Sequence, residues 1–379
     1  MASDLLSTPP PLAPPKTWDA TVNWLRLIRS RRVGPATFFR LLAEHGTAEA
    51  ALAALPQVAA NAGVKTYAPM SFQVAEAELR AGQRIDAKLL CYGAPDYPHA
   101  LVDIPDPPPV LWALGDVAHL ARPMIALVGA RNASSLGSRM ASALARGLGE
   151  AGFTIASGLA RGIDTAAHLA SLETGTVAVQ AGGVDVIYPR ENAGLHDQIA
   201  EKGVRLSEQP IGLQPMARHF PRRNRLISGL GRAVVVVEAA AKSGSLITAR
   251  EALDQGRDVL VVPGHPFDAR SAGCNMLIRD GATLVRGTRD VLDSIAKPAT
   301  TQTVFRPSEA PEPAPKAPVH DAGAAHEQIL GLLGPTPVAE DQLIRDLKLD
   351  PRLVTPQLVT LEMEGKITRQ PGGLLARAN

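Results

Sequence analysis

Five short apolar runs recur along the middle of the chain, separated by mixed segments. They are MIALVG (124–129), FTIASG (153–158), TVAVQAGG (176–183), AVVVVEA (233–239) and DVLVVPG (258–264). Apolar and polar positions do not alternate within the runs, which is typical of strands buried on both faces of a parallel sheet. Helical patterns lie between them, at 137–150, 164–173, 192–202 and 245–256. We therefore predict an α/β fold over residues 85–296, a Rossmann-like doubly wound, mostly parallel sheet, which binds ligands at the carboxyl ends of its strands.

The segment before this domain has helical spacing and short loops, and we predict a small all-α domain over residues 17–80. Gly34-Pro35 separates two helices within "WLRLIRSRRVGPATFFRLLAEHG". The turn between them is basic and contains Arg29, Arg31 and Arg32. Two interpretations stay open here. The turn grips a DNA backbone, as helix-hairpin-helix modules do, or it is the solvated face of a helical packing domain.

The remaining segments are two proline-rich stretches and a short C-terminal domain. Residues 1–16 hold five prolines and are predicted to be a disordered arm, and residues 297–322 are predicted to be a linker. Residues 323–379 follow the outline of a winged helix, with helices and then a Gly-Gly hairpin. From Glu327 onward this domain has seven acidic and six basic side chains. Its neutral charge favours an accessory or protein-contact role over DNA binding.

Composition limits the classes of function. The chain has 45% hydrophobic residues, 4% aromatic residues and a formal net charge of +2, so any site for a polyanion must be a local patch. The two cysteines, Cys91 and Cys274, lack metal-ligand spacing and are expected to be buried thiols, with no metal site and no disulfide. No apolar run approaches the length of a membrane span, and no signal peptide is recognisable. We expect a cytoplasmic protein without a membrane-spanning segment.

Such a patch exists in "HFPRRNR", residues 219–225. It holds His219, Arg222, Arg223 and Arg225, and no acidic residue occurs between Glu208 and Glu238. Arginines on a rigid sheet edge would follow consecutive phosphates of a nucleic-acid backbone. We predict that changing all three arginines to Ala abolishes binding of the polyanion and leaves thermal melting close to that of the wild type.

Three loops that follow predicted strands supply further groups for binding anions. The first is "GARNASSLG", the second is "SGLARGIDTAAH", in which Asp164 is expected to cap the next helix, and the third is "AKSGSLITAR". Each offers small residues, backbone N–H groups and one cation in front of a helix. Together with the arginines they predict an extended phosphate-binding surface. The residues concerned are Gly129, Arg131 and Ser134, then Ser157, Gly158 and Arg161, then Lys242, Ser243, Gly244 and Ser245.

Cofactor-binding signatures are missing or misplaced. The only GxGxxG, residues 147–152, closes a predicted helix, whereas a dinucleotide fingerprint must follow a strand and open a helix. No GxxxxGK[ST] motif occurs, so a P-loop for ATP is excluded. We predict no cofactor and no NAD-dependent oxidoreductase.

The acid–base groups of this region do not form a recognisable catalytic set. Asp164 and His168 share one helix face, where a structural role is the simpler interpretation. Glu238 follows a strand and either holds a ribose or fixes Arg223 or Arg225. We predict no catalytic residues. The alternative is a nucleoside-monophosphate hydrolase type of enzyme, in which Glu238 and the Ser243–Ser245 loop would form the site.

Taken in order, six motifs of the chain resemble the DNA-processing protein A (DprA/Smf) family over nearly all of residues 120–290. They are "VGARNASSLG", "SGLARGIDTAAH", "GGVDVIYPRENAGLH", "SEQPIGLQPMARHFPRRNRLISGL", "VVVVEAAAKSGSLITAREALDQGRDVLVVPG" and "GCNMLIRDGA". The resemblance implies a non-catalytic protein that binds single-stranded DNA, protects it during natural transformation and loads the RecA recombinase onto it. It also implies that the protein acts when a single-strand binding protein is present, and that it is a homodimer.

Carried onto this sequence, the resemblance assigns the DNA surface to motif positions. It adds Arg190 of "YPREN" and Asn224 of "FPRRNR" to the residues named above. Phe220 is either a stacking surface for a base or a hydrophobic plug beneath its loop. Ile278 and Leu284, in and after "GCNMLIRDGA", are the expected apolar contacts of the dimer.

Overall fold

A computed structural model describes residues 13–64, 66–296, 322–333, 338–347, 349, 351–370 and 374–378. The chain divides into two compact units, residues 1–300 and 301–379, and each has its own core. Most of the predicted arm, and nearly all of the predicted linker, lie outside the described residues. None of the helices in the described ranges combines the length and apolar composition needed to cross a bilayer.

The first unit begins with a set of helices, as predicted. They are α1 (Trp18–Arg29), α2 (Pro35–His45), α3 (Ala48–Asn61) and α4 (Phe72–Arg84). The side chain of Thr17 caps α1, and Pro35 occupies the first turn of α2, where its missing N–H is not needed. The apolar faces of these helices meet in one core that contains Leu25, Phe38 and Leu41.

This core continues into the edge of the sheet. Trp112 belongs to it, and a Cβ on Gly82 of α4 would overlap the Trp112 indole. The indole N–H of Trp112 donates to Glu78 Oε1 (2.9 Å), and Arg29 pairs with the same carboxylate (3.0 Å). Arg29 also donates to the carbonyl of Glu208 (2.8 Å). The helices and the sheet are therefore packed together rather than merely tethered.

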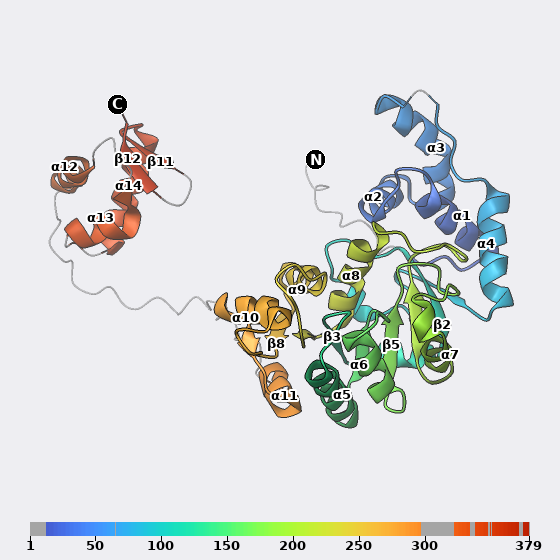
Figure 1. Ribbon diagram of the computed structural model, residues 1–379. Helices are drawn as coiled ribbons and strands as arrows, with labels where there is room; N and C mark the ends of the chain where they lie inside the picture. The colour runs from blue at the N-terminus through green and yellow to red at the C-terminus, as the bar shows by residue number, and fades with distance from the viewer. Residues whose placement is uncertain are drawn as a thin grey trace, which may run out of the picture. The chain divides into compact units, whose positions relative to one another are not determined.

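The sheet is mostly parallel, which confirms the predicted fold class. Its strands lie in the order β1-β2-β6-β5-β4-β3-β7-β8-β9 (Figure 1). Only β1 and β2, at one edge, run antiparallel to their neighbours. The strands are β1 (Lys88–Cys91), β2 (Val110–Gly115), β3 (Met124–Val128), β4 (Thr154–Ser157), β5 (Thr176–Val179), β6 (Val204–Ser207), β7 (Ala233–Val236), β8 (Asp258–Val261) and β9 (Thr283–Leu284).

Helices cover both faces of this sheet. They are α5 (Ser135–Glu150), α6 (Ile163–Ser171), α7 (Ala193–Lys202), α8 (His219–Leu230), α9 (Ser245–Asp254), α10 (Ala272–Arg279) and α11 (Thr288–Ala296), with short 3₁₀ turns η1 (His99–Leu101), η2 (Val117–Ala121), η3 (Arg190–Asn192) and η4 (Ala269–Ser271). Each of the five apolar runs contains a strand, and four of the helices match predicted segments. The sequence pattern missed β1, β2, β6 and β9, and it did not identify the arginine stretch as helix α8.

The two faces of the sheet have separate cores because successive side chains of a strand point in opposite directions. Ala126 and Val128 of β3 pack with α8 and α9, in a core that contains Leu226 and Ala249. Leu127 of β3 packs on the other face with α5 and α6. Burial on both faces explains why the strand sequences are apolar throughout. The second half of α8 packs against one of these faces, which fixes the helix on the sheet.

The second unit has the elements of a winged helix, as predicted. They are α12 (Ala322–Leu332), α13 (Glu340–Leu347), α14 (Pro351–Met363), β10 (Val338–Ala339), β11 (Ile367–Gln370) and β12 (Leu374–Arg377). The strands form a sheet in the order β10-β12-β11. Ile329, Leu343 and Leu358 form the centre of its core with Leu375 of β12.

Candidate nucleic-acid interface

Two adjoining hollows lie at the carboxyl ends of the central strands. From β3 the chain adds β4, β5 and β6 on one side and β7, β8 and β9 on the other, so β3 and β7 form the topological switch point of the sheet. Ligands of doubly wound sheets bind at this point. The hollows have volumes of about 490 and 880 Å³. Both are lined by Arg131, Ala160, Tyr188, Phe220 and Arg223.

Arg223 of α8 lies between the two hollows and is buried, with only 6% of its surface exposed. Its guanidinium rests on the backbone of Gly158, where a Cβ would overlap Nη1. Its Nε is buried without a hydrogen-bond partner, and none of the described residues forms a hydrogen bond or a close ion pair with this guanidinium. Burial lowers the pKa of Arg223 to about 10, and Asp164 opposes that effect. The group therefore stays charged at neutral pH.

The loop after β4 is fixed from below by two buried side chains. Asp164 Oδ2 accepts hydrogen bonds from the backbone N–H groups of Gly158 and Ala160 (both 3.2 Å). The N–H of Leu159, which has a φ of +54°, donates to His168 Nε2 (3.3 Å). The predicted capping role of Asp164 is wrong, because its carboxylate holds the loop that precedes the helix. The structural interpretation of Asp164 and His168 is supported.

Burial sets the ionisation of both groups. It lowers the pKa of His168 to about 3, and the nearby charge of Arg223 adds to the effect, so the ring is neutral. Burial also raises the pKa of Asp164, although Arg223 and the loop hydrogen bonds oppose this. His168 Nδ1 is occupied by the hydroxyl of Thr176 (2.7 Å), which leaves the imidazole no free position for acid–base work.

The loop after β3 is joined to the loop after β7 through Glu238. The Glu238 carboxylate accepts from the N–H of Ser134 (3.0 Å) and from its hydroxyl (2.6 Å). Ser134 Oγ in turn caps α5 by accepting from the N–H of Gly137 (2.9 Å). At Gly129 a Cβ would lie 2.6 Å from Ile163 Cγ1 and 2.9 Å from the carbonyl of Glu238, so only glycine fits. The sequence suggested that Glu238 could hold Arg223 or Arg225 in place. In the structure it binds Ser134 instead.

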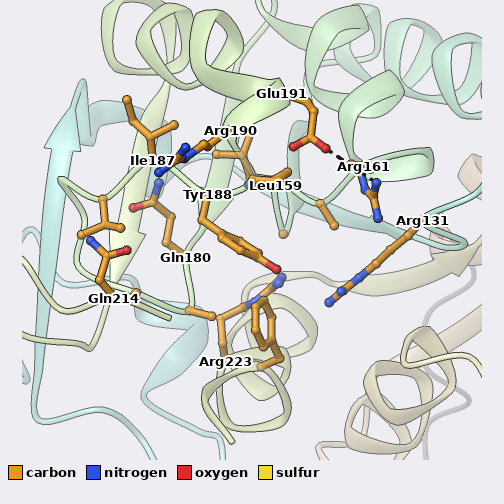
Figure 2. A pocket seen from close by; sticks show the side chains of 17 residues that line it. Arg131, Leu159, Arg161, Gln180, Ile187, Tyr188, Arg190, Glu191, Gln214 and Arg223 are labelled. Carbon is orange, nitrogen blue, oxygen red and sulfur yellow. Dashed lines mark ion pairs between the residues drawn. The ribbon is translucent and has the colours of Figure 1, made fainter. Parts of the chain in front are cut away.

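An aromatic pair stands where the hollows meet. The rings of Tyr188 and Phe220 lie 5.6 Å apart, and the guanidinium of Arg131 lies over the Phe220 ring at 5.1 Å. Figure 2 shows Arg131, Arg223 and Tyr188 pointing toward one another inside the first hollow. Phe220 lines both hollows, so it is not simply a plug beneath its loop.

The loop after β7 lines the second hollow with Lys242, Ser243, Gly244 and Ser245. The hydroxyls of Ser243 and Ser245 lie 2.7 Å apart. Gly244 precedes α9 and offers no side chain to cap it. The first N–H groups of α9 already have acceptors, because Ser245 N donates to Ser243 Oγ (3.4 Å) and Leu246 N donates to the Ser243 carbonyl (3.1 Å). The loop therefore offers Lys242 and the two serine hydroxyls to the hollow.

The other predicted residues divide into three groups. Arg161 and Arg190 line the first hollow, where Arg161 lies 3.6 Å from Glu191, and Asn224 lines the second. Arg222 is exposed on α8 but lines neither hollow, and Ser134 lines neither because it serves the α5 cap. Ser157 and Arg225 are buried away from both hollows.

Ser157 and Arg225 therefore leave the set of DNA contacts. The hydroxyl of Ser157 donates to the carbonyl of Leu127 (2.6 Å). Arg225 is 5% exposed and pairs with Glu208 and with Asp106 (3.0 Å). The physical reason is helical geometry. Residues two apart on a helix point in different directions, so Arg223 and Arg225 cannot both face the hollows.

Arg270 lines the second hollow and was missed by sequence reasoning. It follows β8, the neighbour of β7, and its Nε lies 3.8 Å from Glu238 Oε1. The rule that identified the other loops, a cation shortly after the carboxyl end of a parallel strand, would have found it.

The predicted dimer residues lie at the far end of the sheet. Leu284 is on the edge strand β9 and is 43% exposed, whereas Ile278 of α10 is half-buried against the core. Cys91 and Cys274 are free and buried, as expected. No cluster of His, Cys, Asp and Glu suited to a metal ion occurs within the described residues.

Three family models match the chain in order. Residues 88–296 match "DNA recombination-mediator protein A", residues 19–81 match the DprA-like N-terminal HHH domain, and residues 310–373 match the DprA winged helix domain. The first match covers the Rossmann-like part, the second the N-terminal helices and the third the winged-helix part.

Individual relatives agree with this assignment. DNA processing protein DprA of Streptococcus pneumoniae is 46% identical over 198 residues, which is 52% of this chain and 70% of that protein. Protein Smf of Synechocystis is 34% identical over 323 residues, covering 78% of this chain and 81% of the relative.

Two solved structures have the same fold. The X-ray structure of DNA processing protein A from Streptococcus pneumoniae superposes with a TM-score of 0.58 at 35% identity, over 69% of this chain and 98% of that one. The Helicobacter pylori protein, described for its unique single-stranded DNA binding mode, gives 0.52 at 30% identity, over 56% and 96%. The chain belongs to the family of DNA recombination-mediator protein A, the DprA/Smf proteins.

Proposed function

We propose that the two hollows bind single-stranded DNA and that Arg223 is the central phosphate contact. The observation that carries this proposal is a buried, charged guanidinium without a hydrogen-bond partner among the described residues. A buried cation without hydrogen-bond acceptors is unfavourable, and the nearby charge of Asp164 offsets this cost only in part. A phosphate would supply both the opposite charge and the missing acceptors. The Helicobacter pylori relative, described as binding single-stranded DNA, supports the choice of ligand.

The surroundings of Arg223 favour an extended polyanion over one small phosphate. Cations line both hollows along their length rather than surrounding one point. They are Arg131, Arg161, Arg190, Arg223, Lys242 and Arg270. The hydroxyls of Ser243 and Ser245 add polar groups at the start of α9. Successive phosphates of one strand could occupy these positions.

The aromatic pair favours an unpaired strand over a duplex. Tyr188 is exposed at the junction of the hollows and Phe220 lines both. A base can stack on such a ring only when its face is free, and stacking does not depend on which base it is. We therefore propose that binding has little sequence preference.

The wider role is proposed from the family. The chain would protect incoming single strands during natural transformation and recombination, load RecA onto them, also when a single-strand binding protein is present, and act as a homodimer through Leu284 and Ile278. It would do so without catalytic turnover. In support of this last point, His168, Asp164 and Glu238 are each engaged in hydrogen bonds that hold loops in place.

The nucleoside-monophosphate alternative receives no support from the geometry. It requires Glu238 to face a ribose, but Glu238 is buried, lines neither hollow and holds the N–H and hydroxyl of Ser134. Incubation with nucleoside monophosphates, followed by product analysis, separates the two proposals directly. Release of a free base would contradict the binding proposal.

A salt titration of affinity tests the proposal. Fluorescence anisotropy would compare labelled oligo-dT with a duplex of equal length over a range of ionic strength. With four or five phosphate contacts, the logarithm of the association constant should fall with the logarithm of salt concentration with a slope of about −3. The oligo-dT should bind more tightly than the duplex. Binding that does not depend on salt, or that prefers the duplex, would contradict the proposal.

A further inference from the structure

Phe267 is the most exposed large apolar side chain in the described part of the chain, at 95%. It lies in the loop between β8 and η4, with exposed His265 and Pro266 before it. A phenylalanine in this position buries almost nothing within the chain. The side chain therefore contributes little to folding, and its exposure calls for another explanation.

The loop that carries Phe267 is held in one conformation. The N–H of Asp268 donates to the carbonyl of His265 (2.9 Å), which closes a turn, and the N–H of Phe267 donates to His265 Nδ1 (3.3 Å). The backbone of Gly264 exchanges two hydrogen bonds with the side-chain amide of Asn275 (3.2 and 3.1 Å). The aromatic ring is thus presented to solvent by a supported turn.

The same loop borders the second hollow. Because β8 runs parallel to β7, with Val261 opposite Val236, the loops after both strands leave the same edge of the sheet. Arg270, three residues after Phe267, lines the second hollow. The N–H of Gly273, at the start of α10, donates to the carbonyl of Ala239 in the loop after β7 (2.8 Å).

We propose that Phe267 is a stacking platform for one unpaired nucleobase of the strand whose phosphates occupy the second hollow. The proposal rests on the proposed single-strand binding and extends that surface past Arg270. Arg270 holds the backbone near the ring, and the base covers the ring face. The His265 ring lies beside it, with centroids 5.7 Å apart and planes tilted by 39°. A platform of this kind accepts any base, because every base has a π face.

Substitutions at residue 267 test the platform. Because the Phe267 side chain buries almost nothing, none of them should impair folding. Anisotropy titrations with oligo-dT would compare Phe267→Ala, Phe267→Leu and Phe267→Trp with the wild type. Ala and Leu should each weaken binding about tenfold, since neither can stack, and Trp should retain or improve it. The salt slope should not change in any variant, because no phosphate contact is lost. Leu169→Ala, at an apolar site on α6 that is 52% exposed, is the control.

Two further measurements identify the occupant. The Trp variant should show a fluorescence change on addition of oligo-dT that exceeds that of the wild type, since Trp24 and Trp112 are buried and Trp18 is half-buried on α1. Light scattering should give the same mass for Phe267→Ala as for the wild type. If Phe267→Leu binds as tightly as the wild type, or if Phe267→Ala lowers the measured mass, the platform is wrong and Phe267 contacts a second protein chain. If the wild type binds oligo-dT in a salt-dependent way and Phe267→Ala binds it equally tightly, the platform is wrong and the single-strand proposal stands. No binding by the wild type overturns both proposals.

Discussion

The guanidinium of Arg223 lies against the backbone of Gly158, so closely that a Cβ on residue 158 would overlap its Nη1. Helix α8 supplies the arginine and the loop after β4 supplies the glycine. Because Asp164 and His168 hold that loop from below, neither partner can move away easily. The position of the buried cation is therefore set by a residue that carries no charge.

Gly158→Ala should displace Arg223 from the junction of the hollows. We expect single-strand affinity to fall by at least tenfold, and overpacking to cost about 1–3 kcal/mol in the free energy of unfolding. Anisotropy and thermal melting measure the two effects. Gly194→Ala on α7 is the matched control, because nothing lies within 4 Å of its Cβ position. If both variants bind alike, the Gly158 contact has no role in binding.

Arg223→Met should separate binding from stability. A similar-sized apolar side chain removes a buried charge that lacks hydrogen-bond acceptors, but it also removes the cation that stabilises the buried Asp164 carboxylate, so the free energy of unfolding should change little. The affinity for oligo-dT should fall steeply, and the salt slope should become shallower by about 0.7. Loss of stability with unchanged binding would assign Arg223 to the fold instead.

Arg225→Ala should act in the opposite way. Removing Arg225 leaves Glu208 buried without its partner, which should cost about 3 kcal/mol in the free energy of unfolding. Arg222→Ala, less than one turn before Arg225 on α8 but exposed to solvent, should leave thermal melting unchanged. The sequence-based expectation that all three arginines could be removed without loss of melting temperature is therefore revised. Equal melting of the two single variants would restore it.

The neutral imidazole of His168 should make the fold sensitive to acid. Its pKa is about 3 in the folded chain and near 6.5 when unfolded, so between these values the unfolded state binds more protons. The stabilisation is complete above about pH 6.5 and is lost as the pH falls toward 3. His168→Gln should flatten the dependence of unfolding free energy on pH by up to one proton, measured by denaturant titration at several pH values. An unchanged pH dependence would show that His168 does not titrate on unfolding.

Leu284→Glu should produce monomers if the proposed dimer uses the edge strand. A charge placed in an apolar contact is left without a partner there, while the exposed monomer tolerates it. Ile278 is a poorer probe because it also packs against the core. Light scattering reads the mass, and Val74→Glu on exposed α4 is the control. A wild type that is already monomeric, with or without oligo-dT, would contradict the dimer.

Much of the central sheet could be predicted because its strands are apolar on both faces. β3 and β7 are examples, since their alternate residues enter two different cores. β6 was missed because Arg205 interrupts its apolar run, and that arginine is buried. Helix α8 was missed because Pro221 and Gly229 suggest a loop, although the proline falls in the first turn, where helices tolerate it.

The candidate site could be predicted loop by loop, but not the roles of its arginines. Arg223 and Arg225 are indistinguishable in the sequence. Their difference depends on Gly158, Asp106 and Glu208, which are far away along the chain and become neighbours only after folding. Pair distances of this kind are set by tertiary packing and leave no periodic trace in the sequence.

The shared core around Trp112 limits how this chain can be divided or recombined. A fragment starting near residue 85 would lose the helices that cover the indole, together with Glu78 and Arg29. In such a fragment the apolar surface around Trp112 would be exposed at the edge of the sheet. The N-terminal helices and the sheet should therefore be kept together in any truncated chain. The C-terminal unit has an interior of its own around Ile329 and Leu358, so this limit does not apply to its core.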